Sequence, residues 1–407
     1  MKHKQWRWGV LLCGLGLGGL ILGLGSSSAH EGRAAAGRFP HSVILGDFNV
    51  DGHLDMAVAA SAERKITVLL GDGKGGVASN HSYGVPRGPV WVTAGDLNGD
   101  GYLDLVSTNS GAASVTLYFN NGKGDFGARQ DLEAFKAPVA AVVGDFDQDG
   151  RMDLSVADTL LSRVLIFRGD GKGEFKPMGQ YPSGRRPHIM AEADLNKDGL
   201  VDLLVTSLGQ HTISVLLGKG DGTFYGPKAI KVGRFPHYMA VADFTGDSHP
   251  DVAVVCAGED AVYLLAGNGK GDLRKVAEFP AGVNPHPIAT ADFDGDGHLD
   301  LVVGNRSSRD LTILKGDGTG AFTRLPAVNL PDDPIVLATG DFDRDGNPDL
   351  ILIFASLHAA SIYRGDGRGG FIPPAKAERR NDQGREVYSA RAEGSWGRDS
   401  RKTEGMP

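Results

Sequence analysis

A nine-residue acidic motif recurs seven times along this chain at a constant step of 49 residues. Its common form is Asp-x-Asp/Asn-x-Asp-Gly-x-x-Asp, and the copies begin at Asp47, Asp96, Asp145, Asp194, Asp243, Asp292 and Asp341. A proline keeps the same step, a phenylalanine keeps it in most copies, and no copy contains an insertion or a deletion. Self-similarity at a period of about 20 to 50 residues is typical of repeat architectures. The chain should therefore fold as seven equivalent units.

Each unit has the pattern of β-structure. In the fourth copy, apolar runs at 188–193, 203–206, 213–217 and 224–232 are separated by Gly, Asp and Pro, which predicts four short strands. Asp-Gly pairs such as Asp170-Gly171 are typical of tight hairpin turns, and 60 of the 407 residues are glycine. We find no segment of about 10 to 12 residues with helical periodicity.

Four antiparallel strands in each of seven units predict an all-β, seven-bladed β-propeller spanning residues 37–379. Residues 30–36 are interpreted as a linker, and 380–407 as a disordered, charged tail. An open solenoid is the alternative, but it needs polar caps, and the first and last copies are as regular as the others. The sequence offers two ways to close the ring, because the fourth strand of the last blade could come from 375–379 or from the N-terminal segment.

The first 29 residues have the layout of a secretory signal peptide. Lys2, Lys4 and Arg7 precede an apolar run at 9–25, and small residues follow at 27–29. An uncleaved anchor is the alternative. We expect a secreted, periplasmic or cell-surface protein with no membrane span after cleavage. With Cys13 in this leader, Cys256 is the one cysteine of the mature chain, which excludes a disulfide framework.

The acidic motif has the chemistry of a calcium loop. Its positions 1, 3, 5 and 9 carry oxygen ligands, position 6 is usually glycine, and Ca²⁺ takes about 6 to 8 oxygens. Without a cation these carboxylates would repel one another. It is not an EF-hand, because position 12 is an apolar residue or serine rather than glutamate. A simple preference of turns for Asp and Gly is the alternative, which seven matching copies disfavour.

The predicted cofactor is therefore structural Ca²⁺ at six or seven sites. The fifth loop should be the weakest, because Thr245 and Ser248 replace the usual ligand and glycine. The predicted metal ligands are Asp47, Asn49, Asp51, Asp55, Asp96, Asn98, Asp100, Asp104, Asp145, Asp147, Asp149, Asp153, Asp194, Asn196, Asp198, Asp202, Asp243, Thr245, Asp247, Asp251, Asp292, Asp294, Asp296, Asp300, Asp341, Asp343, Asp345 and Asp349.

This loop, following a short apolar strand, resembles the FG-GAP repeat of integrin α subunits and of bacterial VCBS-type proteins. The resemblance covers about 343 of the 407 residues. It implies a seven-bladed propeller with calcium in loops on one rim and ligands on the opposite face. The family also includes lectins and propellers attached to enzymes, so the resemblance does not fix the function.

A candidate ligand face lies at the other ends of the strands. Basic and histidine residues flank the repeated proline there: Arg38, His41, Arg87, Lys136, Arg185, His188, Arg234, His237 and His286. Arginine suits bidentate recognition of carboxylate, sulfate or phosphate. Alternatively, these side chains are solvated and bond to local carbonyl groups, or the histidines form an adventitious transition-metal site.

Two functions follow. The first is a non-enzymatic recognition or adhesion module for a protein or an anionic glycan. The second is an extracytoplasmic polysaccharide lyase or hydrolase at the channel mouth, although no catalytic residues stand out. A structural domain of a surface complex is a third. The net charge of −8 argues against a nucleic-acid partner, and the oligomeric state stays open.

Overall fold

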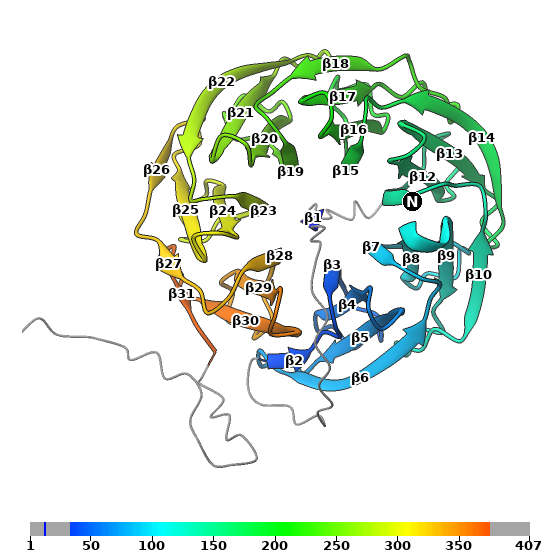
Figure 1. The fold of residues 1–407 in the computed structure, drawn as a ribbon, viewed down its shortest axis with the longest axis horizontal. Coiled ribbons are helices and arrows are strands. Elements are labelled where there is room, and N and C mark those ends of the chain that lie inside the picture. Colours follow the sequence, from blue (N-terminus) through cyan, green and yellow to red (C-terminus); the bar gives the residue numbers. More distant parts are fainter. Residues whose placement is uncertain (1–11, 14–32, 375–407) are drawn as a thin grey trace, which may run out of the picture. The chain divides into compact units, whose positions relative to one another are not determined.

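The computed structural model describes residues 12–13 and 33–374. The tail predicted at 380–407 and all of the predicted signal peptide except residues 12–13 lie outside the described residues. The predicted fold class is confirmed: seven sheets, each built on four antiparallel strand positions, are arranged around a ring (Figure 1). One short 3₁₀ helix, η1 (Ser110–Ala112), is the single helical element of the described part.

Each blade runs from an innermost strand outward in chain order. The first four blades consist of β3 (Pro40–Gly46), β4 (Asp55–Ala60), β5 (Lys65–Gly71) and β6 (Val77–Gly84); β7 (Pro89–Gly95), β8 (Asp104–Asn109), β9 (Ser114–Phe119) and β10 (Ala128–Leu132); β11 (Pro138–Gly144), β12 (Asp153–Asp158), β13 (Arg163–Gly169) and β14 (Phe175–Pro182); and β15 (Pro187–Ala193), β16 (Asp202–Ser207), β17 (Thr212–Leu216) and β18 (Lys228–Lys231).

The fifth and sixth blades and the chain-order part of the seventh consist of β19 (Pro236–Ala242), β20 (Asp251–Cys256), β21 (Ala261–Gly267) and β22 (Leu273–Pro280); β23 (Pro285–Ala291), β24 (Asp300–Asn305), β25 (Asp310–Gly316), β26 (Phe322–Arg324) and β27 (Val328–Asn329); and β28 (Pro334–Gly340), β29 (Asp349–Phe354), β30 (Ala359–Gly365) and β31 (Phe371–Ile372). In the sixth blade β26 and β27 both pair with β25 and share the outermost position.

The repeated proline and the last aspartate of the motif mark strand starts. Every innermost strand begins with the proline, and every second strand begins with the aspartate. Proline fits the first residue of a strand because it lacks the backbone N–H that an interior ladder position needs. In all seven blades the pairing register shifts directly after the proline, as between Pro40 and Ser42. The acidic motif thus forms the connection between the first and second strands.

The ring is closed. Each innermost strand contacts the next, and β28 of the last blade contacts β3 of the first. The outermost position of the seventh blade is completed by β2 (Arg33–Ala35), which pairs antiparallel with β30. Ala35 pairs with Ala359 just as Asn329 pairs with Asp310 one repeat earlier. The N-terminal segment therefore closes the ring, and residues 375–379 lie outside the described part.

Aromatic rings of neighbouring blades pack against one another at the acidic motifs. Phe48, the second residue of the first motif, packs edge-on against Phe126 of the second blade, with ring centroids 5.8 Å apart. Phe146 and Phe224 repeat this contact at 5.6 Å, and both are 2–3% exposed. Edge-to-face pairs contribute about 0.5 to 1.5 kcal/mol beyond burial. In four blades a phenylalanine of the motif thus packs against the repeated phenylalanine of the following blade.

The short strand β1 (Leu12–Cys13) lies within the predicted signal peptide. It pairs antiparallel with β28 and contacts the innermost strands β3, β19 and β23, which places it at the centre of the ring (Figure 1). Among residues 12–13 and 33–374, no helix is long and apolar enough to cross a bilayer.

Candidate metal-binding rim and the opposite face

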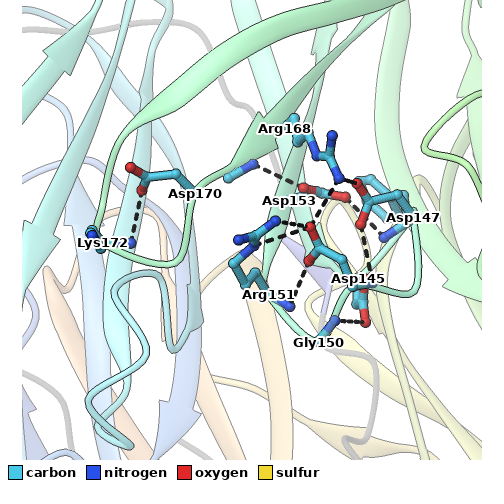
Figure 2. A network of polar contacts seen from close by, with 11 residues as sticks. Asp145, Asp147, Gly150, Arg151, Asp153, Arg168, Asp170 and Lys172 are labelled. Carbon is cyan, nitrogen blue, oxygen red and sulfur yellow. Dashed lines mark hydrogen bonds and ion pairs between the residues drawn. The ribbon is translucent and has the colours of Figure 1, made fainter.

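The first aspartate of each motif organises the loop through backbone hydrogen bonds. In the first blade the Asp47 carboxylate accepts from Asp51 N at 3.1 Å and from Gly52 N at 2.9 Å. Asp51 Oδ1 then accepts from His53 N at 2.8 Å. Gly52 has a φ of +81°, which glycine adopts at little cost. The loop therefore winds inward and turns its side-chain oxygens toward one another, as Figure 2 shows for the third blade.

The last aspartate of each motif has a structural task that sequence reasoning did not identify. Asp202 Oδ2 accepts a hydrogen bond from Leu195 N and Asp202 Oδ1 accepts one from Gly218 N, both at 2.8 Å. The same two bonds occur in all seven blades. This carboxyl clamps the loop to the end of the third strand. It is 0–2% exposed in every blade.

Burial is the main cause of raised pKa values at this position. It raises the pKa of Asp202 to about 6 and that of Asp104 to about 7, against the lowering effect of the two backbone hydrogen bonds. The neighbouring carboxylates raise both further. Crowded, partly desolvated carboxyl groups of this kind are stabilised as anions by a bound cation.

Oxygen atoms of the motif converge closely enough to bind one ion. In the third, sixth and seventh blades, carboxylate oxygens from motif positions 1, 3 and 9 lie within 4.8 Å of one another. These triads are Asp145, Asp147 and Asp153; Asp292, Asp294 and Asp300; and Asp341, Asp343 and Asp349. The hard oxygen donors suit Ca²⁺, Mg²⁺ or Mn²⁺ rather than softer metals. The residues present therefore fit a divalent cation.

The position-3 residue differs between the other blades. Asn49, Asn98 and Asn196 each donate a side-chain N–H to the position-5 aspartate, at 2.9, 3.0 and 2.8 Å. Their Oδ1 atoms face inward and accept from the position-5 backbone N–H. In the fifth blade Thr245 Oγ1 is buried and has no hydrogen-bond partner among the described residues. A buried oxygen without a hydrogen-bond donor can be satisfied by a bound cation.

The basic residues on the opposite face bond to their own blades. Arg87 Nη2 donates to Gly111 O at 2.9 Å, Arg185 Nη2 to Gly209 O at 3.2 Å, and Arg234 Nη2 to Gly258 O at 2.7 Å. Each acceptor lies in the connection between the second and third strands of the same blade. Each guanidinium group thus bonds to a backbone carbonyl of its own blade. The three arginine side chains and that of Lys136 are nevertheless exposed. Arg38 is half-buried, and its backbone N–H donates to Glu63 Oε1 at 3.0 Å.

Three of the four predicted histidines converge. His237 and His286 stack with ring centroids 4.0 Å apart, and His188 meets His237 edge-on at 4.9 Å. His41 belongs to β3 of the first blade, and its Nε2 lies 2.9 Å from Ser61 Oγ. Burial lowers the pKa of His188 to about 4 and of His286 to about 3, and it also lowers the pKa of His237. The three rings are therefore uncharged at neutral pH.

This histidine cluster should make the protein acid-sensitive. A histidine whose pKa is lower in the folded state than its usual 6.5 contributes stability above pH 6.5 that is lost as the pH falls toward 4. At pH 5 each of His188 and His286 should cost about 2 kcal/mol of unfolding free energy. Denaturant unfolding in saturating calcium, at pH 7 and at pH 5, measures this.

The matched control is the triple variant His188→Val, His237→Val and His286→Val, because Val90 and Val139 occupy the equivalent place in other blades. The variant should lose most of the difference between pH 7 and pH 5. An equally steep pH dependence in the variant would show that other groups cause the sensitivity.

Comparison with known proteins identifies the family of the chain. A family model described as FG-GAP-like repeat matches residues 47–107, 96–156, 145–205, 194–254, 243–303 and 292–352. Comparison with curated proteins finds no match.

Solved structures share the fold at low sequence identity. BBS1N in complex with ARL6DN is 16% identical, with 82% of this chain and 92% of that chain covered and a TM-score of 0.58. An inactive virginiamycin B lyase from Staphylococcus aureus with quinupristin is 15% identical, with 79% and 94% covered and a TM-score of 0.55. A 6-phosphogluconolactonase-like protein from Bacteroides uniformis is 14% identical, with 72% and 86% covered and a TM-score of 0.55. At such identity the likeness shows the fold alone.

The repeat model spans most of the chain, its unit coincides with the 49-residue step, and the described part forms seven blades whose first connection is the acidic motif. The chain therefore belongs to the FG-GAP-like repeat family and folds as an integrin α-like β-propeller.

Proposed function

We propose that this protein is an exported, calcium-stabilised β-propeller that recognises a protein or an anionic glycan on the face opposite its acidic rim. The observation that carries the calcium part is the sevenfold recurrence of one loop whose turn is clamped by a buried carboxyl, with carboxylate oxygens converging within 4.8 Å in three of the copies. The ions are structural: Asp, Asn and Thr oxygens hold them, and their charge relieves the repulsion between the carboxylates.

Exposed apolar and cationic side chains support the recognition part. Leu160, Val283 and Phe235 are 73%, 53% and 45% exposed, and all three belong to connections on the face opposite the acidic rim. The side chains of Arg87, Lys136, Arg185 and Arg234 are exposed on the same face. Large apolar residues beside cations suit a partner that presents acidic groups on an apolar surface. Export rests on the signal-peptide pattern at residues 1–29.

Two measurements test this proposal. Calcium titration by calorimetry should give six or seven sites per chain. Retention on immobilised acidic polysaccharides and proteins should then be reduced at least about tenfold by the variant Arg87→Glu, Lys136→Glu and Arg234→Glu. Arg368→Glu is the matched control, because Arg368 lies on the acidic rim in the turn between β30 and β31.

The outcomes separate the alternatives. Retention that all variants share would place recognition elsewhere on the molecule. New reducing ends or unsaturated sugars after incubation would instead favour the lyase or hydrolase. A stoichiometry near zero would contradict the calcium loops.

The fifth loop offers a gain-of-function prediction. Ser248 has a φ of +65°, where glycine is favoured, and Thr245 supplies a hydroxyl where other blades supply an amide or carboxylate. The double variant Thr245→Asn and Ser248→Gly should raise calcium affinity at this blade by about tenfold and stabilise the protein by about 1 kcal/mol. Calorimetric titration against the parent measures it, and an unchanged isotherm would contradict the assignment of these two residues.

A further inference from the structure

One position near the end of the third strand carries a cationic side chain in three of the seven blades. Arg168, Lys315 and Arg364 occupy the same place near the ends of the third strands β13, β25 and β30. The other four blades have Leu70, Phe119, Leu217 and Ala266 there. The three blades with the cation are those whose motif carries aspartate at position 3: Asp147, Asp294 and Asp343.

Each cation contacts the position-3 carboxylate of its own blade. Arg168 Nη2 lies 2.6 Å from Asp147 Oδ2 and 3.1 Å from Asp149 Oδ2 (Figure 2). In the sixth blade Lys315 Nζ pairs with Asp294 and lies 3.0 Å from Asp296 Oδ2.

In the seventh blade Arg364 Nε lies 3.6 Å from Asp343 Oδ2. The side chain at this strand position thus reaches the same carboxylate in all three blades.

The position-3 carboxylates are nearly buried, which explains why they need a partner. The side chains of Asp147, Asp294 and Asp343 are 4%, 10% and 12% exposed, whereas the cations are 37–49% exposed. A buried carboxylate without a counter-charge is strongly destabilising. Where position 3 is Asn or Thr, no such charge exists, and the strand residue is apolar.

The formal charge of the four predicted ligand positions together with the strand residue is therefore the same in all seven blades. At motif positions 1, 3, 5 and 9 together with the strand residue, three blades combine four aspartates with one cation and four blades combine three aspartates with none, which gives −3 in each blade. Arg151, Lys197 and Arg344, at other motif positions, add one positive charge to the third, fourth and seventh loops. In the third blade Arg151 also pairs with Asp149, which makes the sixth blade the clearer place for a test.

We propose that Arg168, Lys315 and Arg364 set the metal affinity of their blades by neutralising the fourth carboxylate, so that the ligand positions and the strand residue together carry the same charge in all seven blades. This inference rests on the proposed calcium loops. Removing the cation should strengthen metal binding at that blade, and adding one to a blade that lacks it should weaken binding there.

The test uses a blade-specific reporter in the full chain. His298→Trp places a tryptophan at motif position 7 of the sixth blade, where it sensitises the luminescence of bound Tb³⁺; the second blade already has Tyr102 at this position. Calcium then displaces Tb³⁺, which gives the calcium affinity of that one loop. Leu200→Trp serves the same purpose in the fourth blade.

Three variants are compared with their reporter parents. Lys315→Leu should bind calcium at least about tenfold more tightly, since a unit charge a few ångströms from the ion no longer opposes it. Leu217→Lys in the fourth blade should bind at least about tenfold more weakly. The pair Asp294→Asn with Lys315→Leu copies the first blade and should return to within about threefold of the parent.

The outcomes distinguish this inference from the proposed function. Tb³⁺ luminescence that is absent in the parents, or that calcium does not reduce, overturns the calcium loops themselves. Parents that bind calcium, together with Lys315→Leu and Leu217→Lys affinities within twofold of them, overturn only the role of the three cations.

Discussion

Chelation of divalent cations should lower the melting temperature of this protein by more than about 20 °C. A ligand present at a hundredfold excess over its dissociation constant stabilises the folded state by about 2.7 kcal/mol per site. Six such sites would add on the order of 16 kcal/mol. Metal removal would also leave the carboxylates of each motif unscreened at close range. Thermal unfolding in excess EDTA and in millimolar calcium measures the difference.

Magnesium provides the matched control for the identity of the ion. Mg²⁺ is smaller, demands near-octahedral geometry and gives up its waters reluctantly. Adding back magnesium after chelation should restore less of the melting temperature than calcium does at the same concentration. Identical melting curves with and without EDTA would remove the basis for calcium as the structural cofactor.

Asp202→Ala should destabilise the metal-free protein by about 3 kcal/mol. The substitution leaves Leu195 N and Gly218 N, both now bonded to this carboxyl at 2.8 Å, buried and unpaired. Each unsatisfied buried donor costs about 1 to 3 kcal/mol. Urea unfolding in EDTA measures the effect without the contribution of the ion.

The control is Asp198→Ala in the same motif. Asp198 is exposed, and its contacts to Leu200 N and Asn196 Nδ2 lie at the loop surface. Its loss should cost less than about 1 kcal/mol in EDTA but should weaken calcium binding. Equal destabilisation by the two substitutions in EDTA would contradict the clamp formed by the last aspartate.

The sequence was sufficient to predict the fold because the relevant signals are local and repeat. Proline starts each innermost strand, and the motif's last aspartate starts each second strand, so both boundaries could be placed seven times. The 49-residue step then required equivalent units in equivalent surroundings, and the closed ring satisfies this. The acidic loops were found for the same reason, since their Asp and Asn residues lie within nine residues of one another.

Contacts between distant parts of the chain could not be predicted in this way. The pairing of β2 with β30 joins segments more than 300 residues apart, and the sequence could not choose between the N-terminal segment and 375–379 for this strand because no local pattern in Arg33–Ala35 marks it. The stacking of His237 on His286 depends on how closely two innermost strands approach in the ring. The bonds from Arg87, Arg185 and Arg234 to carbonyl groups depend on side-chain rotamers that residue type does not fix.

The charge pattern of the acidic rim could be predicted only in part. The sequence contains both halves of it, since Arg168, Lys315 and Arg364 occur only in copies with aspartate at motif position 3. Each cation lies 21 residues after the position-3 aspartate, so the contact between them becomes evident only when the third strand is folded beside the loop. By itself the sequence determined the number of blades, their strand starts and the acidic loops, because short-range turn chemistry and periodicity encode them. Only the tertiary structure decided which charges, rings and strand edges meet, because ring curvature brings together residues that are remote along the chain.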